Sequence, residues 1–420
     1  MMVLRPIFKY TSVIQWLTTI GVFLPSVIGP FFMPTVLEIC AITFGVFLLY
    51  LRRRYLTVDR NLMILFLVLL IAECIIIFTI NYPYNRFIQQ YLMLVYYFVC
   101  YYILFKFSRN CIYELFNKYI KLSYIISLLA IIQFCIHYIL KINIFRAFVI
   151  NADVLSATGI LRVNAILMEP GVLATVLVPA VAYYILYIKK HKKNRYYALM
   201  LLVTIILTFS TLGYVMLTII ILYAITRNFT HIRAFALIGI LIFFTFISSM
   251  FSDDSNEHTN HSNMQIILTK LEDTINGIQN LTPEDIEVLN LSSYATLMNL
   301  YIAKESPSRL FGTGLGNHPY SYEQIYQSNH PNYGLNKNDA YSLLTRIYSE
   351  LGIVGIFLLC LFIIKNRNSS SYINTCTLII IIAFLIRGGH YTLNGTIFFL
   401  FMYYYSNKKY EKKINCNICS

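Results

Sequence analysis

Arginines stand at the ends of three apolar runs of this sequence, and their side chains could bind a phosphate group. Arg162 precedes one run, Arg346 opens a second and Arg387 closes a third. A guanidinium is charged at any physiological pH, and its planar fork can hold two phosphate oxygens at once. The three arginines therefore indicate a site for a phosphate-bearing ligand. The alternative is that each arginine is an anchor whose head reaches the membrane–water interface.

Glu169 is the first candidate for a general base. It follows Arg162 by seven residues, which predicts a position about two helical turns deeper on the same face of one helix. Pro170 and Gly171 follow directly and would loosen that helix, so that a cavity could open beside the carboxylate. A buried carboxylate can take the proton of an acceptor hydroxyl. A structural ion pair between helices is the alternative.

Asp339 and His330 are the next candidates for the base, after Glu169. Both lie in the longest polar stretch of the chain, where a carboxylate or an imidazole could accept a proton. His318 and His390 are placed on the same side. Each histidine taken alone also fits an ordinary hydrogen-bonding loop residue.

A strongly apolar chain must position these residues. The sequence has 420 residues, of which 58% are hydrophobic and 12% charged, and its mean hydropathy is +0.64. This composition excludes a cytosolic globular enzyme, a disordered chain and a secreted disulfide scaffold. The apolar runs continue for roughly 20 residues without alternating, which excludes a porin-like barrel. The sequence therefore predicts an all-α polytopic membrane protein.

About twelve membrane-spanning helices are expected. Nine of them form an N-terminal membrane bundle over residues 1–250, a polar stretch occupies 251–345, and the last spans and a cytoplasmic tail occupy 346–420. The expected spans are 11–29, 31–50, 61–80, 88–106, 119–140, 163–188, 196–210, 212–226, 234–250, 346–364, 372–387 and 390–405.

The distribution of charge predicts which side each segment faces. The chain has a net charge of +14, yet residues 251–345 contain 11 acidic and 4 basic residues. With the N-terminus in the cytoplasm, alternation of the spans puts 23 of the 33 basic residues on the cytoplasmic side, as the positive-inside rule requires. Both termini are then inside and the acidic stretch outside. No nucleic-acid partner is expected, because the basic residues lie in short loops rather than on one folded face.

The polar stretch 251–345 is expected to contain amphipathic helices. Thr282 and Pro283, followed by two acidic residues, form the start of a helix. Apolar residues then recur from Ile286 to Tyr301, and an earlier stripe runs over 266–278. The glycine-rich segment GTGLG at 312–316 lacks the lysine of a phosphate-binding loop and is predicted to form turns.

Five segments, in their order, resemble the O-antigen polymerases of the Wzy type, which are related to the O-antigen ligases. They cover about 160–390 of the chain, and the other spans match only in number and hydropathy. The segments are RVNAILMEPGVLA in a mid-chain span, TFSTLGY at 208–214, RLFGTGLG in the late outside loop, NDAYSLLTRIYSELGIVG at 338–355 and RGGHY near the last span.

The resemblance implies a C-type glycosyltransferase-like fold in the bacterial inner membrane, with the active site facing the periplasm. It implies transfer of a glycan from undecaprenyl diphosphate onto a lipid-linked oligosaccharide repeat unit, in lipopolysaccharide O-antigen biosynthesis, without a metal or other cofactor. Arg309, within RLFGTGLG, then joins the other three arginines as a ligand of the diphosphate. The lipid bilayer and a chain-length regulator protein are the further partners.

Two other functions remain open from the sequence. An O-antigen ligase would use the same donor and pass the glycan to lipid A core. Related ligases often have a His-Asn pair where this chain has Asn338-Asp339, which leaves the identity of the base open. A lipid-linked oligosaccharide flippase also has about twelve spans, but short outside loops would be expected of it.

Overall fold

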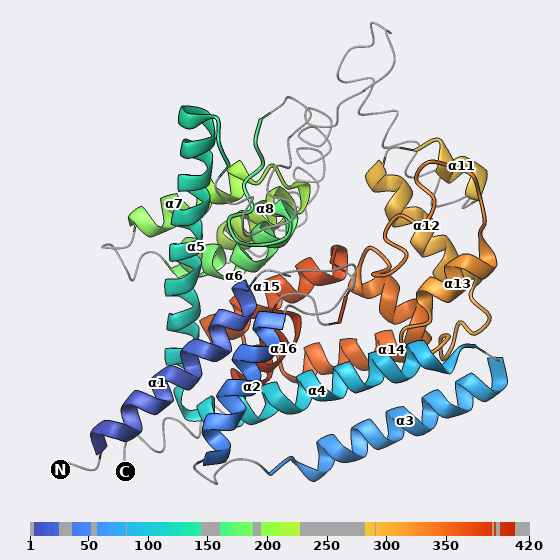
Figure 1. Cartoon of the computed structure of the whole chain (residues 1–420), viewed down its shortest axis with the longest axis horizontal. Helices are drawn as coiled ribbons and strands as arrows, with labels where there is room; N and C mark the ends of the chain where they lie inside the picture. The colour runs from blue at the N-terminus through green and yellow to red at the C-terminus, as the bar shows by residue number, and fades with distance from the viewer. Residues whose placement is uncertain are drawn as a thin grey trace, which may run out of the picture.

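The computed structural model describes residues 4–24, 36–51, 57–80, 82–143, 160–187, 195–226, 282–289, 291–388, 390–391 and 395–407. These residues form an all-helical protein (Figure 1). Among them, three stretches are long and apolar enough to cross a membrane: Tyr84–Leu140, Pro170–Tyr187 and Leu343–Lys365. The structure is therefore compatible with a helical membrane protein.

The helices follow the apolar runs of the sequence closely. The first group comprises α1 (Leu4–Ile20), η1 (Gly21–Phe23), α2 (Val36–Leu51), α3 (Arg60–Ile80), α4 (Tyr84–Ser108), η2 (Arg109–Cys111), α5 (Ile112–Leu140), α6 (Pro170–Tyr187), α7 (Arg195–Leu207) and α8 (Thr211–Thr226). The second comprises α11 (Pro283–Glu287), α12 (Leu291–Glu305), α13 (His318–Ile325), α14 (Leu343–Lys365), α15 (Tyr372–Ile386) and α16 (Thr396–Tyr405). The prediction of a helix is confirmed for eleven of the twelve expected runs, and the run 234–250 and the stripe 266–278 lie outside the described residues.

Helix α6 lies at the centre of the bundle. Every residue from Leu173 to Tyr184 is buried, and the helix has apolar residues all round. It contacts α5, α7, α8 and α15, and the Tyr119 hydroxyl of α5 donates to the Val176 carbonyl of α6 at 2.6 Å. An apolar helix without a polar face is expected to be surrounded in this way.

Helix α3 has the opposite character. It lies at the edge of the molecule beside α4 (Figure 1). Leu65, Leu67, Val68 and Ile75 are each more than half exposed along it. Soluble monomers rarely expose an apolar surface of this kind, whereas lipid chains would cover it.

The described part of the polar stretch, from residue 282 onward, contains three helices that pack together. Helices α11, α12 and α13 gather at one end of the molecule (Figure 1). Thr282 caps α11 as expected, because its hydroxyl accepts from the Asp285 backbone N–H. The helices enclose a core that comprises Ile286, Tyr294, Leu297, Met298, Ile302, Tyr322 and Tyr326.

The segment Arg162–Glu169 is not part of a helix, so the predicted span 163–188 begins too early. Helix α6 starts at Pro170, because a proline disfavours the helical conformation of the residue before it and fits the first helical position. Helix α5 provides hydrogen-bond partners for this irregular backbone. The buried Gln133 side chain accepts from the backbone N–H groups of Asn164 and Ala165 at 3.1 and 2.8 Å. Irregular backbone at membrane depth is tolerated where protein surrounds it.

Candidate functional site

Arg162 and Arg387 come together from segments far apart in the sequence. Arg387 follows the last residue of α15, while Arg162 is held by the turn between α7 and α8, where its Nε donates to the Thr208 carbonyl at 3.1 Å. Burial lowers the pKa of Arg162, and the like charge of Arg387 lowers it further, more strongly than the Glu169 carboxylate raises it. Within the described part of the chain, neither arginine has a carboxylate within 4.0 Å. Two like charges this near each other could bind an external anion.

Asp339 is the carboxylate near Arg387 and Arg346, while Glu169 is the one near Arg162. Asp339 lies in the turn that precedes α14, half-buried, and its Oδ1 and Oδ2 accept from the Tyr341 backbone N–H at 3.1 Å and the Asn336 side-chain amide at 3.3 Å. Burial raises the pKa of Asp339, while these hydrogen bonds and the charges of Arg346 and Arg387 oppose the rise. A carboxylate with a raised pKa is better suited to accept a proton than an exposed aspartate.

The turn that contains Asp339 is strained. Asn336, Ala340 and Tyr341 have φ values of 57°, 56° and 63°, in the left-handed region that side chains disfavour. Such conformations cost on the order of 1–3 kcal/mol each and are concentrated at functional sites. Tyr341 also joins the turn to the end of α15, because its carbonyl accepts from Gly388 N at 2.9 Å and its ring lies 5.6 Å from the Arg387 guanidinium.

Arg346 is buried and already satisfied, unlike the other two arginines. Its side chain is 3% exposed, and its Nε donates to Oε1 of the fully buried Glu350 at 3.0 Å. A second nitrogen, Nη1, donates to the Asn338 carbonyl at 3.2 Å, and the guanidinium lies 4.9 Å from the Tyr391 ring. These contacts favour a structural role for Arg346 over a direct contact with a diphosphate.

Helix α14 is kinked two residues after Glu350. Gly352 has φ 64° and ψ −162° inside the helix, and the segment 309–314 pairs with the broken backbone. Thr313 N and Gly314 N donate to the Ser349 and Glu350 carbonyls at 3.0 and 2.9 Å, while the N–H groups of residues 353 and 354 donate to the carbonyls of residues 309 and 310. The glycine-rich segment forms turns as predicted, and the structure adds that these turns dock into the kink.

Two glycines make this docking possible. A Cβ at Gly312 would lie 2.3 Å from the Glu350 carbonyl carbon, and one at Gly352 would lie 2.3 Å from the Leu310 carbonyl oxygen. Neither position can accept a side chain without displacing the backbone opposite.

Glu73 ties the docked segment to α3. The carboxylate is buried, and its Oε2 accepts from the Leu315 backbone N–H at 3.0 Å. Burial of an ionisable residue in an apolar helix is costly and usually has a structural or functional reason. Here the reason is the contact between a peripheral helix and the loop that supports α14.

His318 joins the loop to α14 on the other side. The imidazole is fully buried, with Nδ1 2.8 Å from Ser349 Oγ and Nε2 2.9 Å from Asn299 Oδ1. The Asn299 amide nitrogen donates to two carbonyls, so its oxygen faces His318 and the proton lies on Nε2. Burial lowers the pKa of His318 to about 3, and the nearby Arg346 charge adds to this effect. His318 is therefore a neutral structural residue.

Two predicted site residues lie away from the arginine pair, and a third, Glu169, lies near Arg162 but is exposed. His330 stacks on Tyr294, with ring centroids 5.2 Å apart, in the core of the loop unit. Arg309 is exposed and pairs with Glu305 at 3.8 Å. Glu169 is exposed at the start of α6, so the prediction that it is buried two turns below Arg162 on one helix is wrong.

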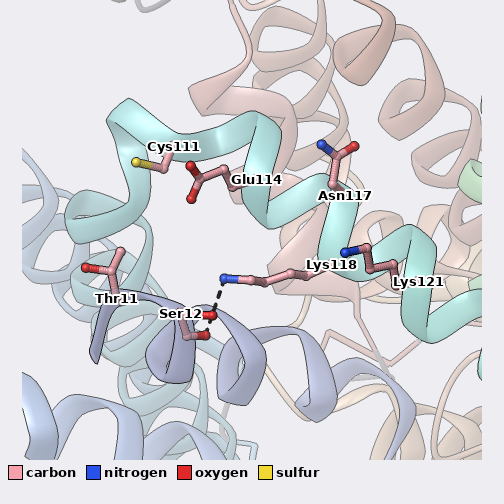
Figure 2. A pocket seen from close by; sticks show the side chains of 7 residues that line it. All are labelled: Thr11, Ser12, Cys111, Glu114, Asn117, Lys118 and Lys121. Atoms are coloured by element: carbon pink, nitrogen blue, oxygen red, sulfur yellow. Dashed lines mark hydrogen bonds between the residues drawn. The ribbon is translucent and has the colours of Figure 1, made fainter. Parts of the chain in front are cut away.

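A cleft of about 520 Å³ lies at another part of the molecule and contains none of these residues. Residues from the middle of α1, from η2 and from the first turns of α5 line it. Figure 2 shows Lys118 reaching from α5 toward Ser12 of α1, to whose carbonyl it donates at 3.3 Å, while Glu114 and Cys111 lie on the opposite side. This cleft has no connection with the arginine pair.

Sequence reasoning found four of the clustered residues and missed the residues that hold them. Glu73, Gln133 and Glu350 lie inside apolar helices, where a lone polar residue is a signal that could have found them. The roles of Tyr341 and Tyr391 carried no such signal, because tyrosine is abundant throughout the chain.

The described residues define an all-helical protein with apolar helices compatible with a membrane, in which Arg162 and Arg387 lie near each other. Comparison with protein-family models, curated proteins and solved structures finds no match in any of the three.

Proposed function

We propose that this chain is an O-antigen polymerase. The observation that carries the proposal is the approach of Arg162 and Arg387, with the Asp339 carboxylate near Arg387. An anion site next to a proton acceptor is what glycosyl transfer from a lipid diphosphate needs. The fold would be of the C-type glycosyltransferase class, with about twelve spans in a bacterial inner membrane.

The chemistry divides between the arginines and the aspartate. The acceptor hydroxyl oxygen attacks the anomeric carbon of the donor glycan, and the bond between that carbon and the diphosphate oxygen breaks. The electron pair leaves with undecaprenyl diphosphate, whose developing charge Arg162 and Arg387 stabilise. Asp339 takes the hydroxyl proton, and a single displacement inverts the anomeric centre. Glu169, near Arg162 but exposed, is the second candidate for the base.

The contacts among the five resembling segments support the proposal. RVNAILMEPGVLA bonds to TFSTLGY through Arg162 and the Thr208 carbonyl. RLFGTGLG bonds to the kinked SELGIVG, and NDAY bonds to RGGHY through the Tyr341 carbonyl and Gly388 N. Segments that are short and loosely defined in the sequence thus form two hydrogen-bonded groups. Arg162 belongs to one group and Arg387 to the other, and the two arginines lie near each other.

The proposed alternation of spans agrees with which helix ends meet. Ends placed outside contact each other, as in the pair Tyr82 and Tyr320, with ring centroids 4.7 Å apart. Ends placed inside also contact each other: Tyr113, at the start of α5, and Tyr187, at the end of α6, both lie against Tyr372 at the start of α15. The loop unit would then face the periplasm, where the lipid-linked repeat units and a chain-length regulator protein would meet it.

A gene deletion in the strain that encodes the chain tests the function. Lipopolysaccharide from the deletion strain is separated on a gel, and polymer on the carrier lipid is measured separately. A single repeat unit on the lipid A core supports the polymerase. Absence of glycan from the core while polymer accumulates on the carrier lipid identifies a ligase, and absence of both identifies a flippase.

A further inference from the structure

Glu350 is a buried carboxylate that the mechanism above leaves without a role. Its side chain is fully buried, and Oε1 accepts from Arg346 Nε at 3.0 Å. Its backbone carbonyl is held as well, by the Gly314 N–H at 2.9 Å, two residues before the kink at Gly352. The position of this carboxylate is therefore fixed through both its side chain and its main chain.

Arg346 links the Glu350 carboxylate to the turn before α14. Its Nη1 donates to the carbonyl of Asn338, the residue directly before Asp339. Because Glu350 occupies Nε and the Tyr391 ring lies against the guanidinium, Arg346 has a single orientation in which this bond forms.

The turn needs such support from outside. Asn336, Ala340 and Tyr341 all have positive φ, a conformation that persists only where surrounding contacts impose it. The other end of the turn is held by Gly388 N, next to Arg387. The distance between the Asp339 carboxylate and the Arg387 guanidinium thus depends on how firmly the turn is held.

We propose that Glu350 is a positioning residue, which through Arg346 and the Asn338 carbonyl fixes the Asn336–Tyr341 turn and sets where Asp339 lies relative to Arg387. This inference rests on the proposed function for its catalytic consequence. A buried pair that served only to stabilise the fold would change the amount of folded protein and leave the conformation of the Asn336–Tyr341 turn as it is.

Two neutral variants of the Arg346–Glu350 pair change the charge that acts on Asp339 in opposite directions. The charged groups that face Asp339 are Arg346 of α14 and Arg387 after α15, and the polar groups are the Asn336 amide and the Tyr341 N–H. Glu350→Gln leaves Arg346 unneutralised, which lowers the pKa of Asp339. Arg346→Gln removes a positive charge and raises it. The acid limb of the pH profile is expected to move down in the first variant and up in the second.

The assay uses the purified full chain with lipid-linked repeat units extracted from the deletion strain. Glu350→Gln is expected to lower kcat about 10- to 100-fold, with little change in KM, because the base is displaced rather than the substrate site. Glu350→Asp keeps the charge on a shorter side chain, and we expect a smaller loss with the acid limb unmoved. Glu305→Gln, which breaks the exposed i,i+4 pair with Arg309, is the matched control and should behave as the wild type.

Hydrogen exchange gives a readout that does not need activity. Peptides covering residues 336–341 should exchange faster in Glu350→Gln and Arg346→Gln than in the wild type or Glu305→Gln. Unchanged exchange in these peptides overturns the positioning role, as does a kcat of Glu350→Gln equal to that of the wild type. A wild-type protein that extends no lipid-linked glycan refutes the proposed function, and the exchange measurement then decides the positioning role by itself.

Discussion

Lysine in place of Arg162 or Arg387 tests the anion site at the scale of single residues. Lysine keeps the positive charge and loses the planar fork that holds two phosphate oxygens. We expect chain extension to fall about 10- to 100-fold in each variant, measured with lipid-linked repeat units at matched protein levels. Arg86→Lys is the control, because Arg86 pairs with Glu323 at 4.0 Å on the loop unit. Full-length polymer from both variants would show that the two arginines are interfacial anchors.

The two carboxylates nearest the arginines should differ in their effect on rate. Asp339→Asn keeps the shape of the turn and removes the proton acceptor, so we expect a loss of about 10²- to 10⁴-fold. Glu169→Gln, at an exposed position, should cost much less. Because burial raises the pKa of Asp339, activity should fall on acidification at a pH above the ordinary aspartate range. The reverse order of the two variants would assign the base to Glu169.

His318 should make the fold sensitive to acid. In the unfolded chain the imidazole has a pKa of 6.5, and in the fold burial lowers it to about 3. The unfolded state therefore binds a proton first, and stability falls as the pH drops from 6.5 toward 3. Thermal unfolding in detergent at pH 7.5 and pH 5 should show this loss in the wild type and in His330→Gln, and a smaller loss in His318→Gln. Equal losses in all three would contradict it.

The residue types indicated which side chains could take part in chemistry. They did not indicate which other residues each of these side chains contacts in the fold. Arg162 and Arg346 have the same side chain at the end of an apolar run. Among the described residues the first has no carboxylate within 4.0 Å, while the second is enclosed by Glu350 and Tyr391. That difference depends on long-range contacts, which composition and spacing do not encode.

At the scale of elements, the kink in α14 can be tested with two glycines of similar backbone conformation. Gly312 and Gly334 have φ values of 78° and 77°. An alanine Cβ at 334 would be 3.4 Å from the nearest atom, whereas one at 312 would be 2.3 Å from backbone. Gly334→Ala should cost about 1–2 kcal/mol of stability from its conformation alone, and Gly312→Ala clearly more, as measured by thermal unfolding. Equal costs would mean that the segment 309–314 is not docked as described.

Hydrophobic runs predicted the existence of helices well, because burial of apolar side chains is a local property of the sequence. The start of α6 was misplaced, since the run from Val163 to Leu167 is as apolar as the helix that follows it. Gln133, 31 residues from Asn164, provides the hydrogen bonds that let this run stay irregular. The docking of 309–314 into α14 was missed for the same reason, because its partners are separated by about 40 residues.

At the scale of the whole molecule, the proposed sidedness can be tested with reporters. A reporter that is active only outside the cytoplasm should be active when fused after Asn290 and inactive when fused after Lys192. The reason is the 23-to-10 division of basic residues between the two sides. A cytoplasmic reporter at the same two positions serves as the control and should give the opposite result. The reverse pattern would refute the topology and, with it, the placement of the site.

The kink at Gly352 has a consequence for how the protein is made. It leaves an apolar segment of α14, residues 353–365, that is about 20 Å long at 1.5 Å per residue, which is less than the hydrocarbon core of a bilayer. The remainder of the helix contains Arg346 and Glu350, and its broken backbone is completed by residues 309–314. The ribosome makes those residues before it makes Gly352. With the proposed sidedness, the loop leaves the translocon first, and the last part of α14 takes its final position only when this outside segment folds back onto it.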